Sequence, residues 1–211
     1  WGDSQPIVVV LLFMNDAVSS APTPAKPSNL NVPNILTSIR ILAIPLFAWL
    51  VLRSEGQHMS WMLWSLGCFV ALMITDKLDG DIARAKNLVT DFGKIADPIA
   101  DKALISTALI CLNINGSLPV WVTIVILVRE IGITIWRMFE LRKGNVVPAS
   151  KGGKLKTVLQ TIAVTLFLIP PAHIFHYPAL VVMLIAVVVT TVTGCQYIVD
   201  SMKLKKTVTG E

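Results

Sequence analysis

The chain has 211 residues, of which 54% are hydrophobic and only 15% are charged, and its mean hydropathy is +0.69. Since charged residues make up about 25% of a typical soluble domain, this composition excludes an ordinary soluble enzyme and predicts an integral membrane protein. The formal net charge is +5, but the basic residues gather in predicted loops, so the charge indicates membrane topology rather than nucleic-acid binding.

Six apolar stretches follow an N-terminal arm of different composition. Residues 1–29 form this arm, because residues 16–29 are rich in Ser, Ala, Pro and Thr, which is typical of a flexible segment. Several apolar stretches reach the ~20 residues that a helix needs to cross a ~30 Å hydrocarbon core. The predicted spans are 35–52, 60–77, 99–115, 118–138, 156–172 and 178–199. We therefore predict an all-α polytopic membrane protein, with a bundle of six transmembrane helices at 30–202 and a basic tail at 203–211.

The positions of lysine and arginine orient these helices. Six spans place the N-terminus, the second-to-third loop, the fourth-to-fifth loop and the C-terminus on one side, and these segments carry most of the basic loop residues. The opposite loops carry Arg53, which Glu55 balances. Because Lys and Arg accumulate in cytoplasmic loops, we expect both termini, and any site between the second and third spans, to face the cytoplasm.

Four aspartates lie at helical spacing across the second and third predicted spans. Asp76 and Asp79 are three residues apart, and Asp97 and Asp101 are four apart, so each pair presents two carboxylates on one helix face. Ionised groups at membrane depth cost roughly 2.5–3.5 kcal/mol each even on the lenient insertion scale. Hard divalent cations such as Mg²⁺, Mn²⁺ or Ca²⁺ prefer oxygen ligands. The four aspartates therefore predict a metal site for one or two divalent ions at the cytoplasmic side.

The segment 76–101 resembles the signature of the CDP-alcohol phosphotransferases at every fixed position and spacing. The matching positions are Asp76, Asp79, Gly80, Ala83, Arg84, Gly93, Asp97 and Asp101. Six hydrophobic spans with this signature across the second and third are also similar to that family. The spacing alone leaves a second interpretation of the small residues, because glycine and alanine also let membrane helices pack closely.

The resemblance implies a reaction and a role for each of these residues. In the family, the ions held by the four aspartates bind the pyrophosphate of a CDP-linked lipid, an alcohol attacks the β-phosphorus, and CMP leaves. Asp97 and Asp101 are the expected catalytic residues, with Asp101 as the general base. The residues expected to contact the CDP-lipid are Asp76, Asp79, Gly80, Ala83, Arg84 and Gly93.

Basic residues outside the signature predict the acceptor. Arg129 and Arg137 lie in the fourth predicted span, and Lys154 and Lys156 open the fifth. Together they predict a basic pocket for an acceptor that carries a phosphate group, since an arginine inside a membrane span indicates a functional site. Two simpler interpretations stay open: Glu130 pairs with a nearby cation for structural reasons, and the lysines anchor a cytoplasmic helix end.

Three stretches, 31–47, 127–137 and 151–160, are similar to those of one bacterial subfamily, the phosphatidylglycerophosphate synthases. This similarity implies transfer of a phosphatidyl group from CDP-diacylglycerol to sn-glycerol 3-phosphate, with Mg²⁺ or Mn²⁺. It also implies a homodimer in the plasma membrane, surrounded by membrane lipids. The N-terminal arm is longer than expected for this subfamily.

Other functions remain open at this point. A cardiolipin synthase of the same superfamily would use phosphatidylglycerol as the acceptor, and a phosphatidylinositol-phosphate synthase is a more distant alternative. A cation transporter or channel would be a different class of protein. It would need carboxylates near the membrane midplane, and usually repeated halves, whereas these aspartates are predicted at cytoplasmic helix ends.

Overall fold

The computed structural model describes residues 31–85, 90–142 and 151–209, and across these residues the structure is helical, without strands. The helices are α2 (Val32–Ser54), α3 (Met59–Ala85), α4 (Asp91–Ile114), α5 (Val120–Arg142), α6 (Lys151–Leu168) and α7 (Ala172–Thr209). The predicted arm at 1–29 lies outside the described residues. Helix α7 continues to Thr209, into the predicted basic tail. The all-α class expected from the sequence is confirmed.

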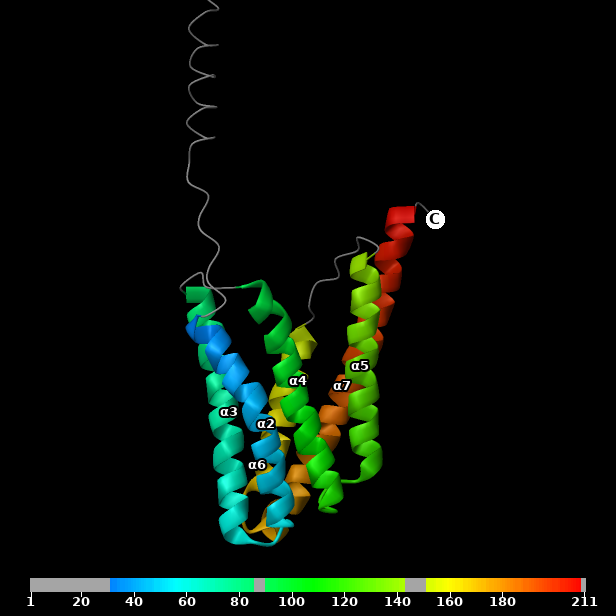
Figure 1. The fold of residues 1–211 in the computed structure, drawn as a ribbon. Coiled ribbons are helices and arrows are strands. Elements are labelled where there is room, and N and C mark those ends of the chain that lie inside the picture. Colours follow the sequence, from blue (N-terminus) through cyan, green and yellow to red (C-terminus); the bar gives the residue numbers. More distant parts are fainter. Residues whose placement is uncertain (1–30, 86–89, 143–150, 210–211) are drawn as a thin grey trace, which may run out of the picture.

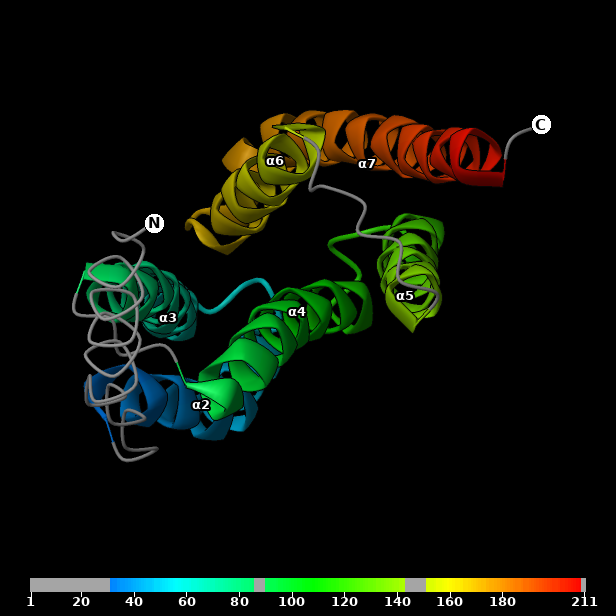
Figure 2. The same cartoon turned by 90° about the horizontal axis from the view of Figure 1, so that it is seen from above.

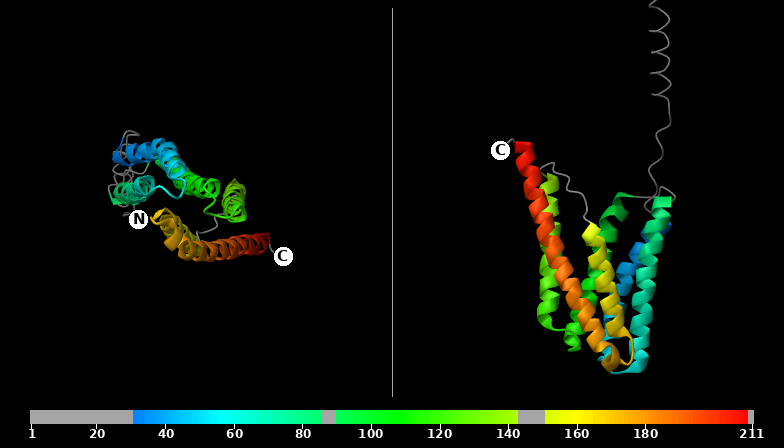
Figure 3. Two further views of the ribbon diagram at one scale, coloured as in Figure 1. Left: turned by 90° about the horizontal axis from the view of Figure 1, so that it is seen from below. Right: turned by 180° about the vertical axis from the view of Figure 1, so that it is seen from behind.

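The helices alternate in direction, which brings both aspartate pairs to one end of the bundle. The start of α2, the end of α3 and the start of α4 lie at this end, together with the end of α5, the start of α6 and the end of α7 (Figure 1). The view from behind shows the same alternation (Figure 3). Asp76 and Asp79 lie near the end of α3, and Asp97 and Asp101 lie in the first half of α4.

The helices pack as two neighbouring groups. Helix α2 packs against α3 and α4, whereas α7 packs against α6 and α5. Helix α6 also contacts α3 and α4, so it joins the two groups (Figure 2). Apolar side chains fill the contacts between helices, and the fully buried ones include Phe47, Phe69, Leu104, Leu109, Val122, Val164 and Met183.

The outer surface is strongly apolar. Leu42 is 78% exposed, Trp64 is 69% exposed and Val128 is 65% exposed. Monomeric soluble proteins rarely expose large contiguous apolar surfaces, so these side chains suit contact with lipid.

Within the part of the chain that the structure describes, three helical segments are long and apolar enough to cross a membrane: Val32–Ser54, Met59–Ala83 and Ala172–Asp200. A shorter apolar helix covers Leu155–Leu168. These segments support the expected membrane protein. The arrangement of six spans stays a prediction.

Candidate active site

A buried arginine of α2 contacts the first aspartate pair. The side chain of Arg40 is 0% exposed; its Nη1 lies 2.6 Å from Oδ1 of Asp76, and its Nη2 forms an ion pair with Oδ2 of Asp79. Asp79 is buried, whereas the Asp76 side chain is 32% exposed. Arginine is almost never fully buried unless it is paired. Here one guanidinium neutralises part of the charge of two carboxylates.

Thr37, one helical turn before Arg40, links the two aspartate pairs. Its hydroxyl donates to Oδ1 of Asp97 at 2.6 Å and lies 3.4 Å from Oδ2 of Asp79. A hydroxyl has one proton to donate, so the shorter contact with Asp97 is the stronger hydrogen bond. Thr37 is 1% exposed and Asp97 is partly buried, so this partly buried hydrogen bond connects α2 with α4.

Asn34, one further turn back, fixes the start of α4 beside α2. Its Nδ2 donates to Oγ1 of Thr90 at 2.7 Å, and Thr90 caps α4 by accepting a hydrogen bond from the Gly93 backbone N–H at 3.0 Å. A Cβ atom on Gly93 would lie only 2.9 Å from Oδ1 of Asn34. Any larger residue at position 93 would therefore have to displace the Asn34 side chain.

Asp97 and Asp101 lie one turn apart on α4, and both are partly buried. Thr37 contacts both Asp79 and Asp97, so the fold brings the two aspartate pairs into one region. The other residues of the signature are placed less fully. Ala83 is buried and Gly80 is partly buried, while the side chain of Arg84 lies outside the described residues.

The donor set fits a hard divalent cation in its chemistry. Four carboxylates lie in this region, and Arg40 contacts two of them, so repulsion between the like charges is costly there. All-oxygen donors of this kind suit Mg²⁺ or Mn²⁺. Among the described residues no three His, Cys, Asp or Glu side chains are already grouped closely enough to hold a metal ion, and one oxygen each of Asp76 and Asp79 contacts Arg40.

A pocket beside Asp101 lies between α4, α5 and α6. Its polar lining consists of Asp101, Lys102, Ser106, Glu130, Lys156, Thr157 and Gln160. Lys156 is 8% exposed and forms an ion pair with Glu130. Lys102 donates a hydrogen bond to the Thr134 hydroxyl. A buried lysine and an aspartate therefore border the same small space, whose volume is about 30 Å³.

The two arginines of α5 that were predicted to bind the acceptor phosphate contact α7 in the structure. Arg129 Nε donates to the Thr190 carbonyl at 2.9 Å, and Nη2 donates to the Thr193 hydroxyl at 3.1 Å. Arg137 lies over the Tyr197 ring at 5.5 Å, within cation–π range. Both arginines thus join α5 to α7.

Glu130 connects these contacts with the pocket. It accepts a hydrogen bond from Nη1 of Arg129 at 3.0 Å and pairs with Lys156. The interpretation of Glu130 as a member of a structural ion pair is therefore supported, and the same ion pair fixes the position of Lys156. The side chain of Lys154 lies outside the described residues.

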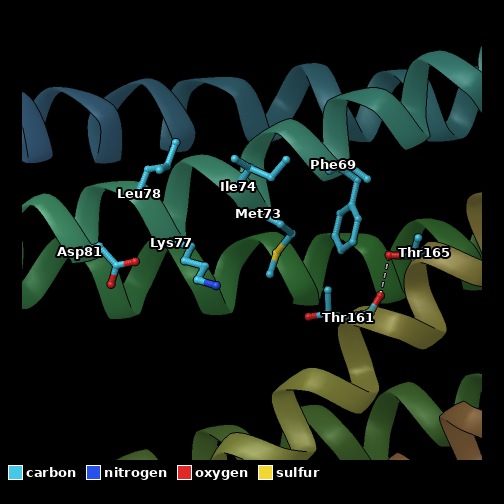
Figure 4. A pocket seen from close by; sticks show the side chains of 9 residues that line it. Phe69, Met73, Ile74, Lys77, Leu78, Asp81, Thr161 and Thr165 are labelled. Carbon is cyan, nitrogen blue, oxygen red and sulfur yellow. Dashed lines mark hydrogen bonds between the residues drawn. The ribbon is translucent and has the colours of Figure 1, made fainter.

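A larger apolar pocket lies between α3 and α6, with a volume of about 450 Å³. Figure 4 shows Phe69 and Met73 of α3 directed toward Thr161 and Thr165 of α6. The lining also includes Val70, Ile74, Lys77, Leu78 and Asp81. Because Lys77 and Asp81 flank Asp76 and Asp79 in sequence, the polar end of this pocket is at the same level as the aspartates.

No role was predicted from the sequence for three polar residues of α2. Asn34, Thr37 and Arg40 are spaced by three residues, so they share one face of α2. A signal for them exists in the sequence, because Arg40 is an arginine inside a predicted span, and such residues indicate functional sites.

Comparison with known proteins adds a second source of information. Residues 30–193 match the family model described as CDP-alcohol phosphatidyltransferase. The chain is 42% identical to a probable phosphatidylglycerophosphate synthase of Mycobacterium tuberculosis (strain H37Rv), over 82% of each chain. It is 38% identical to the CDP-diacylglycerol–glycerol-3-phosphate 3-phosphatidyltransferase of Bacillus subtilis, over 84% of this chain and 98% of that one. A cardiolipin synthase (CMP-forming) of Streptomyces coelicolor is 39% identical over 48% of this chain and 47% of its own.

Proposed function

The chain belongs to the CDP-alcohol phosphatidyltransferase family, and from this premise we propose that it transfers the phosphatidyl group of CDP-diacylglycerol to sn-glycerol 3-phosphate. The products are phosphatidylglycerophosphate and CMP. The relatives that match most of the chain bear this activity in their names. The structural observation that carries the proposal is the convergence of the two aspartate pairs beside a pocket that contains a buried lysine.

Asp76, Asp79, Asp97 and Asp101 are the residues that would hold one or two divalent cations, Mg²⁺ or Mn²⁺. When bound, such a cation neutralises charge on the phosphoryl oxygens of the donor. Gly80, Ala83, Arg84 and Gly93 would contact the CDP group. In this assignment the small side chains leave space at the helix surface, and the guanidinium of Arg84 supplies a fixed positive charge for phosphate.

Asp101 is the proposed general base. It lies on α4 with one side toward the aspartate cluster and also lines the pocket beside Lys156. A carboxylate in this position can accept the proton of an acceptor hydroxyl while a second carboxylate, Asp97, stays with the donor side of the site. Attack of the deprotonated oxygen on the β-phosphorus then releases CMP.

The acceptor phosphate would bind at Lys156, with Lys154 as a further contact. Lys156 forms an ion pair with Glu130. A bound acceptor phosphate would neutralise part of the positive charge of Lys156 that Glu130 now neutralises. As placed, Arg129 and Arg137 reach α7. We therefore propose that both contribute to acceptor binding indirectly. Arg129 holds Glu130, which positions Lys156, and Arg137 helps to hold α5 against α7.

The apolar pocket between α3 and α6 would accept an acyl chain of the donor. Its lining is largely apolar, and Lys77 lies at its polar end, where a lysine can reach a lipid phosphate. We place the enzyme in the plasma membrane with six spans, with both termini and the aspartates on the cytoplasmic side, and we propose a homodimer.

The half-length match to a cardiolipin synthase keeps one other acceptor, phosphatidylglycerol, as the second candidate. The relatives that cover most of the chain favour glycerol 3-phosphate instead. A cation transporter is less well supported, because the aspartates gather at one end of the helices (Figure 1).

The test is CMP release by detergent-purified protein supplied with CDP-diacylglycerol and Mg²⁺ or Mn²⁺. Glycerol 3-phosphate, phosphatidylglycerol, inositol phosphate, serine and no acceptor are assayed separately. Release with glycerol 3-phosphate alone, abolished by EDTA and restored by the metal, is the expected result. Release with phosphatidylglycerol alone would make the protein a cardiolipin synthase, and no release with any acceptor from folded protein would overturn the proposed enzyme class.

A further inference from the structure

We infer that Arg40 is a positioning residue: it holds one oxygen each of Asp76 and Asp79 and serves as a built-in counter-charge that a divalent cation partly replaces. This inference rests on the proposed metal site. It concerns α2, which lies outside the aspartate signature and supplies none of the predicted ligands.

The burial of Arg40 is the first observation. Its side chain is 0% exposed, and moving a charge out of water is costly even when a partner is present. Nε and Nη1 make no hydrogen bond within the described part of the chain, although Nη1 lies 2.6 Å from Asp76. An arginine held in this way contributes little favourable energy by itself. The carboxylates of Asp76 and Asp79 explain its position, because they would repel one another if they had no counter-charge.

The choice of oxygens is the second observation. Arg40 contacts Oδ1 of Asp76 and Oδ2 of Asp79, and Thr37 donates to Oδ1 of Asp97. Each of these three carboxylates therefore has one oxygen held by α2, while its other oxygen lies outside these contacts. A carboxylate can use one oxygen for a protein donor and the other for a cation. Helix α2 thus orients the aspartates without occupying all of their oxygens.

The position of α2 itself is fixed independently of the charges. Asn31 caps α2 by accepting a hydrogen bond from the Asn34 backbone N–H at 3.0 Å, and the Asn34 side chain donates to Thr90 at the start of α4. The polar face of α2 is therefore held against α4 before any cation binds. The metal-free protein can keep its aspartates close together because Arg40 is already there.

This role predicts a coupling between Arg40 and the metal. Without the guanidinium, Asp76 and Asp79 lose their counter-charge, and the metal-free protein is destabilised. A bound cation supplies positive charge to the same carboxylates and recovers part of the loss. If Arg40 had a merely structural role, its substitution would lower the melting temperature by the same amount with and without metal.

The experiment measures thermal unfolding of the detergent-purified full chain in EDTA and in Mn²⁺. We expect Arg40→Gln to lower the melting temperature in EDTA by about 5 °C or more. Mn²⁺ should raise the melting temperature of this variant clearly more than it raises that of the wild type. Arg53→Gln is the matched control, since it makes the same charge change at an exposed residue at the other end of α2. It should leave the Mn²⁺-induced shift unchanged.

A second variant covers the case in which Arg40→Gln does not fold. Arg40→Lys keeps the charge but cannot bridge two carboxylates with a planar fork, and it should also gain more from Mn²⁺ than the wild type. Equal Mn²⁺-induced shifts in wild type and in the Arg40 variants would overturn the inference while leaving the proposed function intact. Absence of both a Mn²⁺-induced shift and metal-dependent CMP release in the wild type would overturn the metal site and this inference together.

Discussion

The hydroxyl of Thr37 donates a 2.6 Å hydrogen bond to Oδ1 of Asp97, and this bond joins α2 to α4 inside the cluster of aspartates. Thr37 is buried and Asp97 is partly buried, and Thr37 also lies 3.4 Å from Oδ2 of Asp79. A residue outside the aspartate signature therefore sets the orientation of one of its carboxylates.

Thr37→Val tests this orientation. Valine has a similar shape but removes the donor, so Asp97 becomes free to rotate. Hydrogen bonds to charged groups contribute about 1.5–3 kcal/mol, so we expect kcat for CMP release to fall roughly 10- to 100-fold. Thr191→Val is the control, because Thr191 is an exposed residue of α7 whose hydroxyl donates to the Val187 carbonyl of its own helix. Similar kinetics for the two variants would remove Thr37 from the site.

Asp101→Asn should abolish turnover while leaving the protein folded. The amide has nearly the same size as the carboxylate but cannot accept a proton from the acceptor hydroxyl. CMP release should fall at least about 10²-fold, the lower end of the contribution of a general base. Asp91→Asn, which changes an aspartate of the same helix outside the signature, should be nearly silent. Equal loss of activity in both variants would contradict the assignment of the four aspartates.

The all-α class and the placing of two aspartates on one face of each helix were predictable because their signals are local. Apolar stretches of membrane-spanning length indicate helices, and spacings of three and four residues put Asp76 with Asp79 and Asp97 with Asp101. The contacts of Arg40 were not predicted, because they depend on how α2 packs against α3. Sequence position alone also left open which neighbour an intramembrane arginine meets.

The contacts of Arg129 could not be predicted from the sequence either. Its place in the fourth predicted span favoured a role in binding the acceptor phosphate, and in the structure Nε and Nη2 contact Thr190 and Thr193 of α7 while Nη1 contacts Glu130. A Cβ atom on Gly194 would lie 3.1 Å from Nε of Arg129, so a small residue on α7 makes room for it. Such a contact between helices distant in sequence leaves no periodic pattern to read.

Lys156 and Arg129 should therefore respond differently to substitution. Lys156→Met removes the charge that faces the pocket, and we expect the apparent KM for glycerol 3-phosphate to rise at least tenfold with little change in the KM for CDP-diacylglycerol. Arg129→Met should mainly lower the melting temperature, because it breaks the contacts between α5 and α7. Steady-state kinetics with each substrate varied in turn, together with thermal unfolding, separates the two effects. A rise in the acceptor KM for Arg129→Met as large as that for Lys156→Met, without loss of stability, would show instead that Arg129 itself contacts the acceptor.

Met73→Trp tests whether the pocket between α3 and α6 holds an acyl chain. Met73 points into the pocket toward α6 (Figure 4), and the larger indole would fill part of its volume of about 450 Å³. We expect a several-fold rise in the KM for CDP-diacylglycerol, smaller for a short-chain donor because short chains need less of the pocket. The KM for glycerol 3-phosphate should stay unchanged, since Met73 does not line the pocket beside Asp101. Val188→Trp is the control, because Val188 is 61% exposed on the outer face of α7. If Met73→Trp binds long-chain and short-chain donors as the wild type does, the acyl chain lies elsewhere on the protein.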